Sequence, residues 1–203
     1  IQSIVIQANA CQLTAVQEEN LDQVQANFKS GVLFGNDYAR METETQGDTL
    51  YIKVAERRTF SWFFKESTVS YSKLDLHIPA SYRGNIQFEL NASDSRIQDL
   101  SSEQTLQVTV QAGKLQLQGI EANQMQFSNN GAKTTMSQIR VSQEASLSCR
   151  AGAVYGDILE AGSFSIMNYA GKTELQGITG PVSSDCSAGA LNLSFAQVVA
   201  DIQ

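Results

Sequence analysis

Apolar and polar residues alternate over most of this chain, and glycine interrupts the alternation at regular intervals. A pattern with a period of two is typical of β-strands that have one buried face. Each interval holds two short strands, and glycine supplies the backbone freedom that a turn requires. The pattern predicts an all-β fold, a single-stranded β-helix or β-solenoid of strand–Gly–strand repeats of 18–21 residues. The turn glycines, at intervals of 18, 21, 19 and 18 residues, are Gly113, Gly131, Gly152, Gly171 and Gly189.

The repeat is also visible as a match of the sequence with itself. Residues 106–120 align over their whole length with residues 164–178, at an offset of 58 residues. Both segments run as strand, Ala-Gly turn, strand, glycine and apolar residue. One repeat cannot bury its apolar face alone, so the repeats are expected to stack as coils, about six in all. An antiparallel β-sandwich is the alternative fold, but it would not account for the self-match.

Stacking places equivalent residues of successive coils in columns. Coils lie about 4.8 Å apart, so two cysteines separated by two coils lie about 10 Å apart, beyond the reach of a disulfide. We therefore expect Cys149 and Cys186 to be free, small, buried residues. We expect the two asparagines of the same column to form an inward polar ladder. The predicted column consists of Val110, Asn129, Cys149, Asn168 and Cys186.

The first 70 residues depart from the regular repeat. Residues 4–6 and 50–54 have the pattern of strands, whereas residues 16–28 fit a strand or a short helix equally well. The strand at 74–78, closed by Pro79, is where the regular coils are expected to begin. We predict a β-rich N-terminal capping section over residues 1–70 and β-solenoid repeats over residues 71–203, in one continuous structural domain.

Composition excludes several classes of function. The formal net charge of −7 argues against nucleic acid and against simple electrostatic adhesion to anionic lipid, because both need clustered Lys and Arg. No apolar run is long enough to predict a transmembrane segment. Three cysteines without a CxxC pair predict neither a disulfide framework nor a zinc site, and no cofactor is expected. The chain opens at Ile1 inside a predicted strand, so we expect an anchor, signal or partner domain upstream.

The order of the predicted elements resembles that of a known family. An opening strand (Ser3–Ile6), a hairpin (Gly47–Ile52) and the Leu-Asp-Leu-His-Ile-Pro strand (Leu74–Pro79) precede the repeats. This order is similar to that of the DUF4097 family, also called toast-rack or "putative adhesin" domains, of bacterial surface and envelope-stress proteins. The resemblance covers nearly the whole chain. It implies a β-helix-like stack, often linked to a membrane segment, that mediates interaction at the cell envelope, and it supplies no catalytic residues.

Few residues are candidates for catalysis. His77 is the only histidine and falls on the polar phase of its strand, so we interpret it as a surface residue and not as a general base. Glu121 and Glu160 fall in one column about 10 Å apart, close to the carboxylate separation of an inverting glycosidase. Arg140 falls between them, which indicates an exposed ladder of charges. We predict that the protein is not an enzyme.

The most unusual stretch of the sequence is aromatic and basic. Four aromatic residues in five positions cannot all face inward, because side chains alternate along a strand. One interpretation is a contact patch for a protein, a glycan or a membrane interface. The other, which we favour, is a capping loop over the end of the solenoid. The candidate contact residues are Arg58, Phe60, Trp62, Phe63 and Phe64.

Together these observations predict a non-catalytic interaction domain of the bacterial cell envelope, either adhesin-like or sensing envelope stress. It would lie at the cell surface, or be membrane-associated through a segment outside this sequence, and the side of the membrane stays open. Its partner would be a protein, a glycan or another envelope component, and unpaired strand edges also allow an end-to-end homodimer. The alternatives are a carbohydrate-active β-helix enzyme and a structural scaffold between other domains.

The two interpretations of the aromatic stretch predict different behaviour of a Trp62→Ser/Phe63→Ser/Phe64→Ser variant. If the stretch is a cap, the variant melts at a lower temperature than the wild type. If it is a contact patch, binding to cell-wall fragments, liposomes or a glycan panel is lost while the melting curve is unchanged. Thermal melting and binding measured in parallel on both proteins decide between them.

Overall fold

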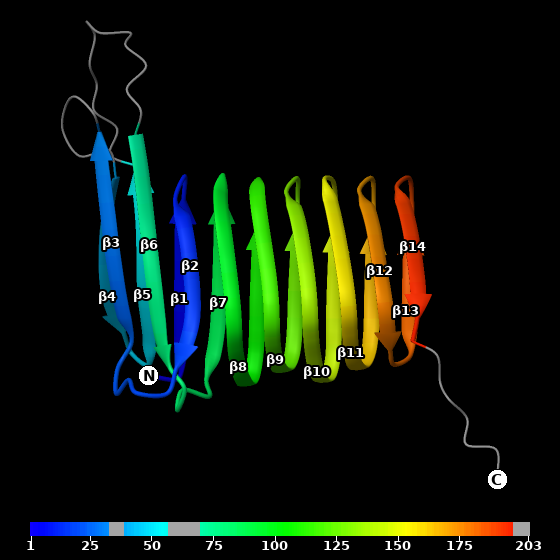
Figure 1. The fold of residues 1–203 in the computed structure, drawn as a ribbon, viewed down its shortest axis with the longest axis horizontal. Helices are drawn as coiled ribbons and strands as arrows, with labels where there is room; N and C mark the ends of the chain where they lie inside the picture. The colour runs from blue at the N-terminus through cyan, green and yellow to red at the C-terminus, as the bar shows by residue number, and fades with distance from the viewer. Residues whose placement is uncertain (33–38, 57–69, 197–203) are drawn as a thin grey trace, which may run out of the picture.

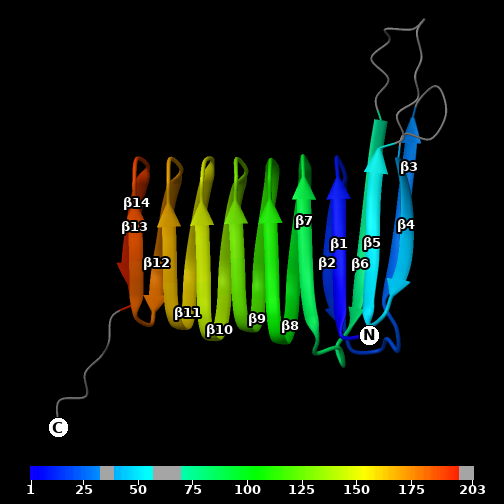
Figure 2. The same ribbon diagram turned by 180° about the vertical axis from the view of Figure 1, so that it is seen from behind.

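The computed structural model describes residues 1–32, 39–56 and 70–196. These residues form an all-β structure, a β-solenoid of about six turns, which confirms the predicted fold class. The coils lie side by side along one straight axis (Figure 1), and the view from behind shows the same regular stack (Figure 2). Among the described residues there is no helix whose length and hydropathy would let it cross a bilayer.

The strands form two facing layers, and the long strands contribute one half to each. The first layer consists of β4 (Ala39–Gln46), β5 (Thr49–Glu56), β1 (Ser3–Asn9), β7 (Asn85–Asn91), the second halves of β8 (Ser93–Val110), β9 (Gly113–Asn129), β10 (Lys133–Cys149) and β11 (Ala153–Asn168), and β13 (Val182–Cys186). The second layer consists of β3 (Gln25–Val32), β6 (Ser70–Pro79), β2 (Gln12–Glu18), the first halves of β8 to β11, β12 (Lys172–Thr179) and β14 (Ala190–Phe195).

Alternation of side chains along each strand creates the core between the two layers. In β7, for example, Ile86, Phe88 and Leu90 are buried while the residues between them face outward. All buried apolar side chains of the described residues belong to one cluster. Burial of an aliphatic or aromatic side chain of this size contributes roughly 1.5–3 kcal/mol, so the stack is stabilised mainly by its apolar column of side chains.

The hydrogen-bonded register confirms the column predicted from the repeats. Val110 pairs with Asn129, Asn129 with Cys149, Cys149 with Asn168, and Asn168 with Cys186. The pairing is parallel throughout this column, so each coil places its equivalent residue directly beside that of the preceding coil. The offset of 58 residues in the self-match corresponds to three coils.

Asn129 is fully buried, and its amide is satisfied by backbone groups. Its Nδ2 donates to the carbonyl oxygens of Ala132 (2.9 Å) and Ala153 (3.3 Å). Its Oδ1 accepts from the backbone N–H groups of Gly131 (3.2 Å) and Ala132 (2.8 Å). The side chain therefore closes the turn of its own coil and ties it to the next coil.

Asn168 repeats this arrangement two coils further along. It is 1% exposed, and its Nδ2 donates to the carbonyl oxygens of Gly171 and Ala190, both at 3.1 Å. Its Oδ1 accepts from the hydroxyl of Thr173. The predicted inward ladder of asparagines is confirmed, and backbone carbonyls supply most of its partners.

The cysteines agree with the sequence-based prediction in one respect and differ in another. Cys11, Cys149 and Cys186 are all free thiols. Burial raises the pKa of the Cys11 and Cys149 thiols above their usual value. The predicted burial of Cys186 was wrong. This residue lies on β13, which pairs with β11 and with no later strand among the described residues, so no further coil covers its side chain.

The first coil of the sequence is not the first coil of the stack. β1 pairs with β5 on one side and β7 on the other, and β2 pairs with β6 and β8. The outermost described strands at this end are β3 and β4, which run antiparallel to β6 and β5. Residues 16–28, left open between strand and helix, contain the end of β2 and the start of β3. The division of the chain at residue 70 stays a prediction.

The buried asparagines can be tested by substitution. We expect Asn129→Ala to lower the free energy of unfolding by about 2–3 kcal/mol, because the buried N–H of Ala132 loses its acceptor. Asn192→Ala removes the same group from an exposed position of β14 and is expected to change stability by less than about 0.5 kcal/mol. Urea unfolding followed by circular dichroism measures both. Equal losses in the two variants would contradict a specific role for the buried amide.

Candidate functional site

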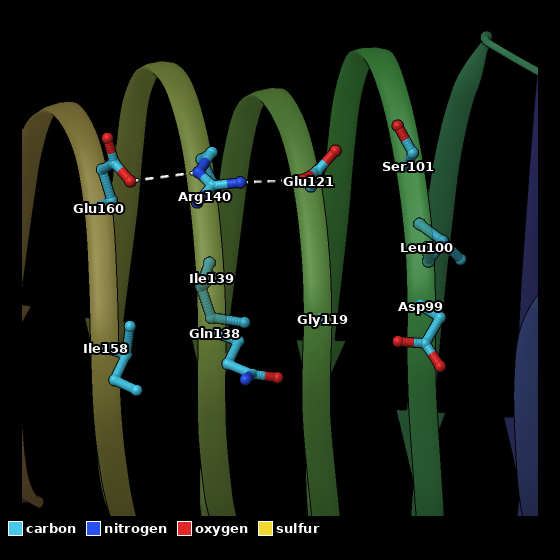
Figure 3. A pocket seen from close by; sticks show the side chains of 10 residues that line it. All are labelled: Asp99, Leu100, Ser101, Gly119, Glu121, Gln138, Ile139, Arg140, Ile158 and Glu160. Carbon is cyan, nitrogen blue, oxygen red and sulfur yellow. Dashed lines mark hydrogen bonds and ion pairs between the residues drawn. The ribbon is translucent and has the colours of Figure 1, made fainter.

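A row of three charged residues and one serine crosses four coils on the outer side of the second layer. Glu121, Arg140 and Glu160 are register partners on β9, β10 and β11. Arg140 Nη1 lies 3.1 Å from Glu121 Oε1, and Arg140 Nε lies 3.1 Å from Glu160 Oε2 (Figure 3). Ser101 continues the row on β8. We call these four residues the charge ladder, and Glu121, Arg140 and Glu160 confirm the exposed ladder predicted from the sequence.

The charge ladder disfavours carboxylate chemistry. Glu121 and Glu160 are each bound by the same guanidinium, and all three side chains are more than half exposed. Hydrogen bonding to Glu160, followed by the charges of Glu160 and Glu121, raises the pKa of Arg140 above its usual value. An inverting glycosidase needs one protonated carboxyl and one free carboxylate with room for water between them. Here a guanidinium that binds both carboxylates occupies the position between them that the attacking water would need.

A second column, two residues before the charge ladder, departs from the regular strand conformation. Its members on β8 to β12 all have left-handed backbones, with φ between 48° and 62°. Glycine adopts this conformation without steric cost. Gly119 also leaves room for the side chain of Asp99 on the adjacent coil, because a Cβ on residue 119 would lie 2.5 Å from Asp99 Oδ1. The column consists of Asp99, Gly119, Gln138, Ile158 and Gly177.

Ile158 is the exceptional member of this left-handed column. A β-branched residue at φ 56° is rare, and the conformation costs an L-residue about 1–2 kcal/mol. The side chain is also 57% exposed, so burial in the core does not offset this cost. Backbone strain of this kind tends to persist at sites of function.

The two columns enclose a shallow groove of about 540 Å³. Figure 3 shows Asp99, Gln138 and Ile158 along one side of the groove and the charge ladder along the other. The floor is formed by buried residues between the columns, including Leu100 and Ile139. The groove thus runs across the coils and offers carboxylates, a guanidinium, an amide and one apolar side chain to a partner.

His77 lies on another coil, as a surface residue of β6. It is paired in register with Val16 and Gln25, and its Nδ1 lies 2.7 Å from Glu18 Oε1. The side chain is partly exposed on the polar side of the strand, as the sequence indicated. The only charged partner within ion-pair distance in the described part of the chain is Glu18, so no nucleophile–base–acid arrangement forms around it there.

The aromatic candidates Arg58, Phe60, Trp62, Phe63 and Phe64 lie outside the described residues and stay a prediction. Within residues 1–32, 39–56 and 70–196, no group of three or more His, Cys, Asp or Glu side chains is arranged to hold a metal ion. Sequence reasoning found the charge ladder but missed the left-handed column beside it. The available signal was the glycine that precedes the apolar residue in both halves of the self-match, at Gly119 and Gly177.

Comparison with known proteins gives one family and one distant solved structure. The model of the family described as Toastrack DUF4097 matches residues 1–203. The crystal structure of a "putative cell adhesion protein" from Clostridium sporogenes ATCC 15579 is 8% identical and has a TM-score of 0.40, over 95% of this chain and 92% of that chain. No curated protein matches.

The strain at Ile158 predicts opposite effects of two substitutions in one column. We expect Ile158→Gly to raise the free energy of unfolding by about 0.5–1 kcal/mol, because relief of the left-handed strain exceeds the added chain entropy. Gly177→Ala is expected to lower it by about 1 kcal/mol, since its Cβ would sit at φ 62° and 3.3 Å from the nitrogen of Ile158. Urea unfolding measures both, and a destabilised Ile158→Gly variant would show that the side chain is held by packing.

Proposed function

This chain belongs to the Toastrack DUF4097 family, and from that premise we propose that it is a non-catalytic interaction domain of the bacterial cell envelope. In this proposal the outer face of the second layer is the contact surface. The domain acts at the cell surface or in association with a membrane, as an adhesin-like module or as a sensor of envelope stress.

The observation that carries the proposal is the groove beside the charge ladder. Glu121 and Glu160 are both paired with Arg140, and Ile158 is kept exposed despite its backbone strain. A surface that binds needs presented side chains on a rigid support, and the continuous parallel sheet beneath the groove provides such a support. A surface that hydrolyses glycans with inversion needs room for a water between two carboxylates, and Arg140 lies there instead.

The regularity of the face also supports binding. Solenoid coils present the same polar positions at a constant spacing, which suits an extended or repetitive partner. The side chains around the groove are mostly neutral and polar or paired in ion bridges, so recognition would depend on shape and hydrogen bonding more than on net charge.

The proposal predicts that wild-type protein binds bacterial envelope fragments and that the groove is required. We expect Ile158→Gly to weaken binding about five- to tenfold, because an exposed apolar side chain that becomes buried on contact is lost. Met167→Ala, which removes an exposed apolar side chain from the first layer, is the matched control and is expected to bind like the wild type. Co-sedimentation with purified envelope fragments measures all three proteins.

Three results would count against the proposal. Absence of binding by the wild type to any envelope fraction would remove the interaction function. Equal binding by Ile158→Gly and wild type would remove the groove as the contact surface. Release of reducing sugars from glycan substrates, abolished by Glu121→Gln, would instead support the enzyme alternative.

A further inference from the structure

Lysines recur in one column of the second layer, at or next to the start of β9, β10 and β12. Lys114 and Lys133 are register partners on β9 and β10, and Lys172 on β12 shares with Lys133 the partner Ala153. We call Lys114, Lys133 and Lys172 the lysine row. All three are exposed and face the same side of the molecule as the groove.

The column continues toward the other end of the stack. Lys73 on β6 and Lys29 on β3 are register partners, and Lys73 also pairs with Gln12 of β2. Leu13 of β2 pairs with Ser95 of β8, so the preceding residues, Gln12 and Asp94, stand opposite each other. Asp94 in turn pairs with Lys114 of β9, which continues the column to the lysine row. Five of the seven lysines in a chain with a net charge of −7 therefore occupy equivalent positions of one face. Lysines scattered at random over the surface would not line up in this way.

Two of the lysines are free to meet an external anion. Lys114 and Lys133 form no ion pair with a carboxylate of the described residues, although Asp94 stands beside Lys114 in the column. Lys172 Nζ lies 2.9 Å from Glu174 Oε1, and this partner raises the pKa of Lys172 and lowers that of Glu174. Lys114 and Lys133 therefore have their ammonium groups available for an external anion.

Tyr155 orders the lysine row. The Nζ atoms of Lys133 and Lys172 lie 5.8 and 5.5 Å from the centre of its ring. Cation–π attraction at this distance limits the freedom of two long side chains, which reduces the entropy lost when they bind an anion. With coils about 4.8 Å apart, the charges of the row are separated by about 5 and about 10 Å along the solenoid axis.

From this arrangement we propose that the lysine row, with Arg96 and Tyr155, binds an extended anionic glycan that runs along the solenoid axis. The inference rests on the proposed function and names the partner class for the same face of the molecule. The neighbouring outward positions hold Gln116 and Thr135, whose amide and hydroxyl groups suit sugar hydroxyls. Arg96 Nε donates to Gln116 Oε1 at 2.9 Å, which holds that amide beside the row.

Nucleic acid fits the row less well than a glycan. Single-stranded nucleic acid binds through open aromatic platforms for its bases, whereas the ring of Tyr155 lies between two ammonium groups. A dense polyphosphate would also be repelled by the net charge of −7. A glycan in which carboxylated sugars alternate with neutral sugars has the lower charge density that three spaced lysines can match.

The test measures affinity for fluorescently labelled hyaluronan and polygalacturonate, with dextran as the neutral glycan and a single-stranded oligo-dT as the nucleic acid. We expect hyaluronan, in which carboxylated and neutral sugars alternate, to bind most tightly and the fully carboxylated polygalacturonate to bind less tightly. Dextran is expected not to bind, and oligo-dT to bind more weakly than either anionic glycan. The Lys114→Gln/Lys133→Gln/Lys172→Gln variant loses three ion pairs with the bound glycan. We expect its affinity for the anionic glycans to be at least about tenfold lower and to depend less on salt concentration.

A matched variant removes the same charge from other positions. Arg40 and Lys53 lie on the first layer and Arg150 follows β10 in a turn, all three exposed. Arg40→Gln/Lys53→Gln/Arg150→Gln is expected to keep the affinity for the anionic glycans within about twofold, because net charge alone is a weak, screened effect. Thermal melting of both variants checks that each is folded.

The outcomes separate this inference from the proposed function. Equal weakening in both triple variants, or binding of oligo-dT as tight as that of the glycans, would overturn the lysine row as a glycan site. Binding of envelope fragments without binding of either anionic glycan would overturn the inference and leave the proposed function intact. Absence of binding to envelope fragments and to glycans would overturn both.

Discussion

Parallel hydrogen bonding in register between successive coils is the constraint on which this structure depends. Once one pair of coils is aligned, every residue has an equivalent about 4.8 Å away on each side, so each column must tolerate its own repetition. Apolar columns do so by forming the core. Polar columns need hydrogen-bond partners, and charged columns need opposite charges on adjacent coils. Asn129 and Asn168 bind backbone groups of their own and the next coil, and Arg140 lies between two glutamates.

This constraint explains why so much could be predicted from the sequence. The turn glycines and the self-match align the repeats, and alignment in a solenoid is equivalent to contact. The column from Val110 to Cys186 and the ladder of Glu121, Arg140 and Glu160 both follow from counting residues between turns. The lysines Lys114, Lys133 and Lys172 were equally visible, because each follows a turn glycine by one or two residues.

Three features were not predicted, because the spacing of the repeats contains no information about them. Asp99, Gln138 and Ile158 take the same left-handed backbone as the glycines of their column, and the repeat period does not indicate a backbone conformation. The exposure of Cys186 depends on how many coils follow it. The position of the first coil between β5–β6 and β7–β8 depends on the order of stacking, which a repeat pattern leaves open.

The internal position of β1 and β2 has a consequence for how the molecule assembles. The opening residues of the chain are a template with two growing faces, one of which receives β5 and β6 and the other β7 and β8. Assembly therefore cannot proceed as simple winding from one terminus to the other. The hairpins that follow β2 must fold back past it before the regular coils extend away from it, so contacts distant in sequence have to form early. Within the sheet, the first eighteen residues thus stand between the two parts of the stack and pair with both.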